Sequence, residues 1–278
     1  MAIGFQPGGG GIVQGQRESI TSPDGVEIGL ITGGVGPRLL LVHGGMGSSA
    51  RWAPLWPLLT ERYQVTAMDR RGRGMSGDTT EYELAKEYDD VLAVADHLVA
   101  EERTSIDAFA HSYGAVCALG AASRGARFRR LALYEPPGPQ TAPREWIDRA
   151  TAMVTAGQVG RAMASFLIEI IGLDQTTITA MRDSPIAHES ILIATATLAR
   201  EAEALSSVDL TELARGVTVP VLLILGERSP QWAATITRAL EHSLAAVTVA
   251  GLPALGHDAL DTAPGLVVAE LDRFFGSI

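Results

Sequence analysis

Short apolar runs alternate with longer segments of helical periodicity along most of this chain. The apolar runs lie at residues 38–42, 63–69, 106–109, 131–134 and 217–225. A short run that is mostly apolar fits a strand buried on both faces, and such strands occur in parallel sheets covered by helices. The alternation therefore predicts an α/β fold with a mostly parallel sheet flanked by helices.

Further elements complete this expected fold. Two strands with polar alternation are expected first, near residues 17–21 and 26–32, and one more strand is expected at residues 245–250. Helices are expected near residues 49–62, 82–100, 231–240 and 264–275, where apolar residues recur at helical spacing.

The strand pattern is interrupted after residue 134. Glu135, Pro136 and Pro137 follow that strand, and proline cannot continue a central ladder. Residues 138–207 show helical periodicity only, which favours an inserted helical lid over additional core helices. The expected division is a flexible tail at residues 1–16, a first core part at 17–137, the lid at 138–207 and a second core part at 208–278.

Composition limits the function classes. The chain has 278 residues, 46% of them hydrophobic, and a net charge of -10, so a nucleic-acid partner is not expected. The arginine clusters at residues 70–73 and 127–130 are interpreted as loop and strand-edge charges. The single cysteine, Cys117, excludes an internal disulfide and offers no basis for a metal site. The first residues lack the pattern of a secretory signal and no apolar stretch could span a bilayer, so a cytoplasmic protein without a membrane partner is expected.

One strand-to-helix junction carries the clearest candidate for chemistry. Residues 110–114 (AHSYG) follow an apolar run and precede small residues, so Ser112 lies where a buried strand turns sharply into a helix. Such a nucleophile elbow exposes the serine hydroxyl and points the first amides of the helix at negative charge. Its common form is G-x-S-x-G, and Ala110 replaces the first glycine. The pentapeptide alone leaves open a helix start without chemistry.

Four segments follow one another in a fixed order along the chain: residues 43–47 (HGGMG), residues 69–76 (DRRGRGMS), the elbow at Ser112 and residues 255–257 (LGH). Together they resemble the corresponding segments of the α/β-hydrolase family. The resemblance extends from Arg17 onward and implies an eight-stranded, mostly parallel sheet with an inserted helical lid. It also implies catalysis without a cofactor, and residues 69–76 are expected to form a structural turn with no chemical role.

A serine hydroxyl becomes a nucleophile only when a base accepts its proton and an acid holds that base in one tautomer. His257 is the expected base, because it lies on a glycine-flanked loop between the last strand and the last helix, where the family places its base. Structural hydrogen bonding is the expected role of His43 and His111.

The expected acid departs from the commonest family pattern. Many members carry an aspartate three residues after the glycine that ends the next-to-last strand, where this chain has Ser229. A minority, including haloalkane dehalogenases and zearalenone lactonases, carry the acid after the strand that follows the elbow helix, and the matching residue here is Glu135. Glu227 and Asp258 stay as alternatives, although Glu227 lies two residues short of the usual position and Asp258 is adjacent to the base.

The resemblance further implies an oxyanion hole and a pocket. Two backbone donors for a tetrahedral oxyanion are expected at Gly45 and Tyr113, with Met46 as the neighbouring possibility. The residues expected to line the substrate pocket are Met46, Trp146, Met153 and Phe166. Such a pocket would take a hydrophobic small molecule.

The expected function is a cofactor-independent serine hydrolase that cleaves a carboxylic ester or lactone. Carbon–carbon bond hydrolysis or a perhydrolase reaction with the same three residues is the alternative within enzymes. A ligand-binding or biosynthetic-helper protein with little turnover is the alternative of another class. Dehalogenation and epoxide hydrolysis are disfavoured, because both need a carboxylate nucleophile where Ser112 stands.

Overall fold

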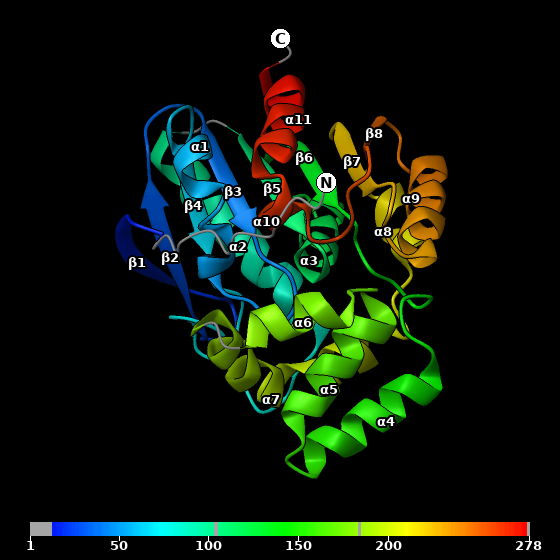
Figure 1. Ribbon diagram of the computed structural model, residues 1–278. Coiled ribbons are helices and arrows are strands. Elements are labelled where there is room, and N and C mark those ends of the chain that lie inside the picture. Colours follow the sequence, from blue (N-terminus) through cyan, green and yellow to red (C-terminus); the bar gives the residue numbers. More distant parts are fainter. Residues whose placement is uncertain (1–12, 103–104, 183–184, 277–278) are drawn as a thin grey trace.

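One sheet organises the part of the chain that the computed structural model describes, residues 13–102, 105–182 and 185–276 (Figure 1). Within these residues it has eight strands, in the order β1-β2-β4-β3-β5-β6-β7-β8. The strands are β1 (Gln16–Thr21), β2 (Glu27–Gly33), β3 (Arg38–Val42), β4 (Gln64–Met68), β5 (Ile106–His111), β6 (Phe128–Tyr134), β7 (Val221–Gly226) and β8 (Val247–Leu252). The pairs β1–β2 and β2–β4 are antiparallel and the remaining pairs are parallel. The predicted α/β fold with an eight-stranded, mostly parallel sheet is confirmed.

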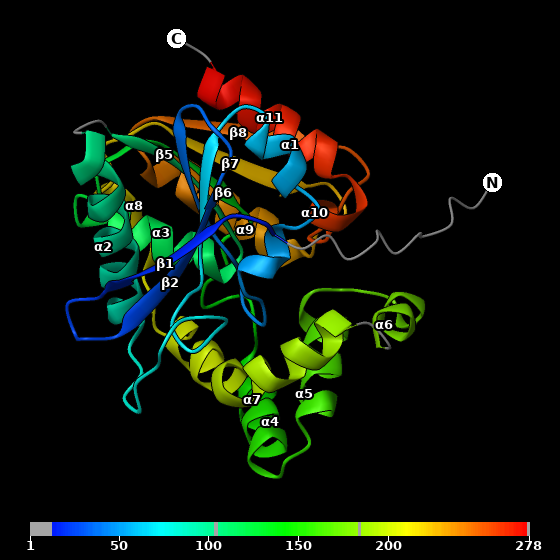
Figure 2. The ribbon, with the colours of Figure 1, turned by 90° about the vertical axis from the view of Figure 1, so that its left-hand side faces the viewer.

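Helices cover both faces of this sheet, and Figure 2 shows α1 and α11 on the side opposite α2 and α3. One face carries α2 (Leu84–Glu102), α3 (Tyr113–Ser123), α8 (Leu210–Arg215) and α9 (Gln231–Ser243). The other carries α1 (Trp56–Thr60), α10 (Ala259–Thr262) and α11 (Pro264–Gly276). Successive side chains of a strand point to opposite faces of the sheet, so an apolar strand needs cover on both faces. In β3, Leu40 and Val42 pack on the first face, and Leu39 and Leu41 pack on the second.

A group of helices follows β6 and lies apart from the two covering layers (Figures 1 and 2). It consists of α4 (Arg144–Thr155), α5 (Val159–Ser165), a π-helical turn (Phe166–Ile170), α6 (Gln175–Arg182) and α7 (Pro185–Leu205). We call these helices the cap helices. They have an apolar cluster of their own, which includes Trp146, Ile147 and Leu198.

Two expectations need correction at the level of single elements. The helix expected at residues 49–62 is a 3-10 turn (Ser49–Trp52) followed by the short helix α1. Pro54 and Pro57 explain the break, because proline lacks the N–H that a continuous helix would need. Strand β7 begins at Val221 rather than at residue 217, directly after Pro220.

Four residues of the expected flexible tail, 13–16, lie within the described part of the chain. Residues 1–12 lie outside the described residues, but Val13 is buried and Gln16 begins β1. The indole N–H of Trp56 donates to the carbonyl of Gln14 at 3.1 Å. Residues 13–16 are therefore held against the folded domain by these contacts. Within the described ranges, every helix is too short or too polar to cross a membrane.

Candidate active site

The topology brings the chemistry-bearing residues to one edge of the sheet. Strands β3, β5 and β6 are adjacent and parallel, so the segments that follow them meet at their carboxyl ends. Gly45 follows β3, Ser112 follows β5 and Glu135 follows β6. His257 comes from the loop after β8.

Ser112 occupies a strained turn between β5 and α3. Its φ of 53° lies in the left-handed region, which a serine adopts only when its surroundings enforce it. Its backbone N–H donates to the carbonyl of Tyr134 at 2.8 Å. A Cβ at Gly114 would lie 2.3 Å from the carbonyl oxygen of His43, so the turn requires glycine there. The geometry is that of a nucleophile elbow.

The carboxylate of Glu135 contacts the imidazole of His257. The distance from Glu135 Oε2 to His257 Nδ1 is 2.6 Å. Glu135 Oε1 accepts from the backbone N–H of Gly226 at 2.8 Å and from the hydroxyl of Ser229 at 2.5 Å. Glu135 is fully buried, and these three contacts satisfy both oxygens of a charge that would otherwise be costly to bury. Ser229, where many family members carry the acid, thus donates to Glu135, the acid expected from the sequence.

Neither of the two alternative acids is hydrogen-bonded to His257 among the described residues. Glu227 is exposed, and its Oε2 accepts from the backbone N–H of Ala254 at 3.1 Å. Asp258 is the residue that precedes α10. Among the described residues, Glu135 is the carboxylate that the structure pairs with His257.

Aromatic side chains surround the ring of His257. The ring centroid of His111 lies 4.6 Å away, and the indole of Trp232 approaches edge-on at 5.7 Å. The hydroxyl of Tyr134 donates to the carbonyl of Gly256, which fixes the loop directly before the base. Since His111 immediately precedes Ser112, the structure places His257 beside the elbow.

Backbone strain gathers around these residues. Four non-glycine residues in the described part of the chain have a positive φ: Met46, Ser112, Glu135 and Ala254. Ser112 directly follows β5 and Glu135 directly follows β6, while Met46 lies shortly after β3. Ala254 lies in the loop that carries His257. Strain of this kind clusters at functional sites, because the surrounding structure has to maintain it.

His43 has the structural role that the sequence suggested. Its ring is fully buried, its Nε2 accepts from the backbone N–H of Arg70 at 3.0 Å, and its Nδ1 lies 2.8 Å from the carbonyl of Gly44. Burial, reinforced by the charge of Arg70, holds the pKa of His43 well below its usual range. A neutral His43 therefore fixes the loop in which Gly45 lies. Among the described residues, the N–H of Gly45 has no protein acceptor, as an oxyanion donor requires.

The turn at residues 69–76 is built on buried charges. Asp69 accepts from the backbone N–H groups of Ser49 at 2.6 Å and Met75 at 2.9 Å. Arg70, Arg71 and Arg73 were interpreted as loop charges, and all three prove to be buried. Burial at this position requires partners, and each of these arginines is ion-paired.

Arg70 lies between two carboxylates at the base of the cap helices. It donates to Glu87 of α2, whose Oε1 lies 2.6 Å from Nη2, and to Glu201 of α7. Its guanidinium also stacks on the ring of Tyr113, 4.4 Å from the ring centroid. Burial alone would raise the pKa of Glu87, but the charge and hydrogen bonds of Arg70 lower it to about 2.

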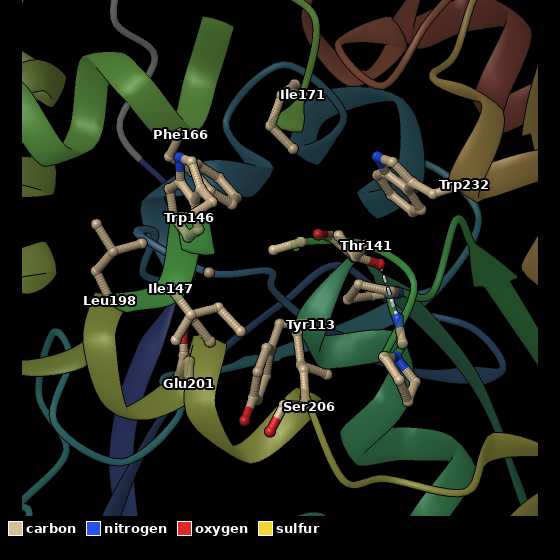
Figure 3. A pocket seen from close by; sticks show the side chains of 18 of the residues that line it. Tyr113, Thr141, Trp146, Ile147, Phe166, Ile171, Leu198, Glu201, Ser206 and Trp232 are labelled. Atoms are coloured by element: carbon tan, nitrogen blue, oxygen red, sulfur yellow. Dashed lines mark hydrogen bonds between the residues drawn. The ribbon is translucent and has the colours of Figure 1, made fainter. Parts of the chain in front are cut away.

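A cavity of about 610 Å³, which opens to solvent, lies between the elbow and the cap helices (Figure 3). Its walls include Gly45, Ser112 and Tyr113, and most of the remaining lining is apolar. Three of the predicted pocket residues line it: Met46, Trp146 and Phe166. Met153 is a correction, because it is not among the lining residues and packs against the apolar cluster within the cap helices.

Two prominent residues of the cavity, Trp232 and Glu201, were not expected from the sequence. Both are labelled in Figure 3, on different sides of the cavity. Glu201 could have been noticed, because it shares one helical face with Leu198, Ala202 and Leu205, where apolar residues are expected. Within the described ranges, no three His, Cys, Asp or Glu side chains are grouped as a metal ion would need.

Comparison with known proteins agrees with this geometry. The sequence model of the "Alpha/beta hydrolase family" matches residues 39–271. The 2-(acetamidomethylene)succinate hydrolase of Mesorhizobium japonicum is 29% identical over 266 residues, which is 90% of this chain and 93% of that protein. An alpha/beta hydrolase from Sphaerobacter thermophilus has a solved structure with a TM-score of 0.75 and 27% identity, covering 90% of this chain and 99% of that chain.

A shorter match concerns a longer protein. The probable oxidoreductase EphD of Mycobacterium tuberculosis is 36% identical over 102 residues, which is 35% of this chain. The matched stretch spans 17% of EphD, so this similarity concerns part of the fold only.

Proposed function

This chain belongs to the alpha/beta hydrolase family, and on that premise we propose that it hydrolyses a carboxylic ester or lactone of a hydrophobic small molecule. The nucleophile is Ser112, the base is His257 and the acid is Glu135. The observation that carries the proposal is the 2.6 Å contact between the buried Glu135 carboxylate and His257 Nδ1, beside a serine held at positive φ.

The reaction follows from this arrangement in two halves. His257 Nε2 accepts the proton of the Ser112 hydroxyl while the serine oxygen bonds to the carbonyl carbon of the substrate. The N–H groups of Gly45 and Tyr113 donate to the resulting oxyanion. His257 then returns its proton to the leaving alkoxide, the carbon–oxygen bond breaks, and an acyl-enzyme remains.

Water clears the acyl-enzyme by the same steps. His257 removes a proton from water, the hydroxide attacks the acyl carbonyl, and Ser112 leaves as its proton is restored. Glu135 acts throughout by accepting from Nδ1, which keeps Nε2 free as the base and stabilises the imidazolium. Ser229 and Gly226 hold the carboxylate in place for that task.

The apolar cavity supports a hydrophobic substrate. The lining of the cavity is mostly apolar, and the side chains of Trp146, Phe166 and Trp232 provide apolar walls for a small molecule. The Mesorhizobium relative is named for a substituted succinate, so that compound belongs in a substrate panel as a second candidate.

An organophosphonate probe combined with a substrate panel tests the proposal. We expect one equivalent of probe on Ser112, and its loss in the variants Ser112→Ala and His257→Ala. The panel contains p-nitrophenyl esters of increasing chain length, a set of lactones and 2-(acetamidomethylene)succinate. Absence of labelling together with absence of turnover would refute a hydrolase and favour a ligand-binding protein.

A further inference from the structure

Glu201 is a buried carboxylate that faces the cavity and that the proposed reaction does not use. It lies on α7, is 4% exposed and forms part of the cavity lining. A Cβ built on Gly45 would meet Glu201 Oε2 at 3.2 Å. This oxygen therefore lies against the loop that is proposed to hold the oxyanion, on the side of the cap helices.

The two oxygens of Glu201 have different surroundings. Oε1 accepts from Nη2 of Arg70 and from Nη2 of Arg73. Among the described residues, no donor reaches Oε2. An oxygen of a nearly buried carboxylate that has no protein partner, on the wall of a cavity, is a vacant hydrogen-bond acceptor.

The charges around Glu201 balance one another. Arg70 and Arg73 carry two positive charges, and Glu87 and Glu201 carry two negative charges in the same buried group. An anionic ligand would approach the unpaired oxygen of Glu201, and both guanidinium groups already form ion pairs with carboxylates. A ligand with an N–H or O–H donor would form a charge-assisted hydrogen bond, which is stronger than a neutral one.

We propose that Glu201 Oε2 is a recognition site for a hydrogen-bond donor of the substrate, a hydroxyl or an ammonium group, and that it disfavours substrates with a carboxylate at that point. The inference deepens the proposed function, on which it rests, because it names the polar group that an otherwise apolar substrate carries. The donor would lie beside the loop of Gly45 and thus close to the reacting carbonyl.

Four esters on one rigid frame test this selectivity. They are the p-nitrophenyl esters of trans-cyclohexanecarboxylic acid with a methyl, hydroxyl, ammonium or carboxylate group at carbon 4, none of which can form a lactone with its own carbonyl. In the wild type we expect kcat/KM of the hydroxyl or the ammonium ester to exceed that of the carboxylate ester by about 100-fold. Comparison of the hydroxyl ester with the ammonium ester shows whether Glu201 prefers a neutral donor or a cation.

The variant Glu201→Gln keeps the size of the side chain and removes its charge. We expect the preference for the favoured donor over methyl to fall by about 10- to 100-fold and the carboxylate ester to improve relative to methyl. The matched control is Glu203→Gln on the same helix, because Glu203 is exposed and pairs with Arg144 at 2.8 Å. That control should leave all four ratios unchanged.

A purely structural role of Glu201 gives a different result. Arg70 also donates to the carbonyl of Gly44 at 3.2 Å, so a disturbed ion pair would alter the oxyanion loop. In that case Glu201→Gln lowers kcat/KM of all four esters by one common factor, and the proposal is overturned. Phosphonate titration and the melting temperature establish that the variant is folded.

Failure of the proposed function can be recognised separately. If no ester is hydrolysed and the probe does not label Ser112, the hydrolase assignment fails. Calorimetry on the Ser112→Ala variant then tests the inference alone, with cyclohexylmethylamine, cyclohexylmethanol and cyclohexylacetate as ligands. Tighter binding of the amine or the alcohol than of the acetate, lost on adding Glu201→Gln, supports the recognition site, and equal binding of all three contradicts it.

Discussion

Replacing Glu135 by glutamine tests the acid with a change of one atom. Glutamine has the shape of glutamate but one acceptor oxygen and one NH2 group. In the structure, Glu135 Oε1 receives two donors, from Gly226 and Ser229, while Oε2 receives His257 Nδ1. The amide oxygen will take the position with two donors, so the NH2 group will face His257.

This orientation determines the size of the effect. An NH2 group facing Nδ1 makes that nitrogen an acceptor, which moves the proton of the neutral ring to Nε2. A His257 with its proton on Nε2 cannot accept the proton of Ser112. The corresponding loss in serine proteases is on the order of 10⁴ in kcat, or about 5 kcal/mol of transition-state stabilisation. We expect Glu135→Gln to lose about that factor with little change in the melting temperature.

The assay is steady-state hydrolysis of the best p-nitrophenyl ester, with Glu227→Gln as the matched control. Glu227 also accepts one backbone N–H, from Ala254, but it is exposed and does not contact His257. The control should keep full kcat. The reasoning is wrong if Glu135→Gln keeps more than about a tenth of kcat while Glu227→Gln loses activity, because the acid would then be on the usual strand.

Three further outcomes follow from the contacts around the site. Tyr134→Phe removes the hydrogen bond to Gly256, so we expect the free energy of unfolding to fall by about 1 kcal/mol and kcat to fall up to about tenfold. Urea unfolding and steady-state kinetics measure the two effects, and no change in either would contradict the role of Tyr134 in holding the loop of His257. Gly114→Ala places a methyl carbon 2.3 Å from the carbonyl oxygen of His43, so the free energy of unfolding measured by calorimetry should fall by about 1–3 kcal/mol or more. An unchanged melting temperature would show that the turn can relax. Burial holds the pKa of both His43 and His111 well below 6.5, so below pH 6.5 the unfolded chain binds more protons than the folded chain. The free energy of unfolding therefore falls as pH falls, by up to about 1.4 kcal/mol per pH unit for each ring. His111→Phe should remove the contribution of one ring between pH 6.5 and 5.5, and an unchanged slope of stability against pH would contradict a contribution from His111.

The sequence was sufficient where local patterns and chain order decide the structure. Apolar runs and their order defined the sheet, and the small residues around Ser112 marked the turn. Glu135 could be singled out because Ser229 occupies the usual place of the acid and two prolines follow Glu135. The structure adds that Ser229 donates to Glu135, a relation between two strands that no local pattern contains.

Other features depend on contacts between distant segments. Glu201 lies on an apolar helical face, and its partners Arg70 and Arg73 are more than a hundred residues away in the chain. Met153 has the size and polarity of a pocket residue, but the way the cap helices pack turns it toward their own cluster. The positive φ of Glu135 is equally hidden, because nothing in glutamate favours that conformation.

The most direct test of the central claim is to trap the acyl-enzyme. A rapidly quenched reaction with the best p-nitrophenyl ester, followed by mass spectrometry of the digested protein, should show the mass of one acyl group on the peptide that contains Ser112. That mass should be absent from Ser112→Ala, which should also lack turnover. Turnover that persists in Ser112→Ala, or an acyl group on another residue, would contradict the account.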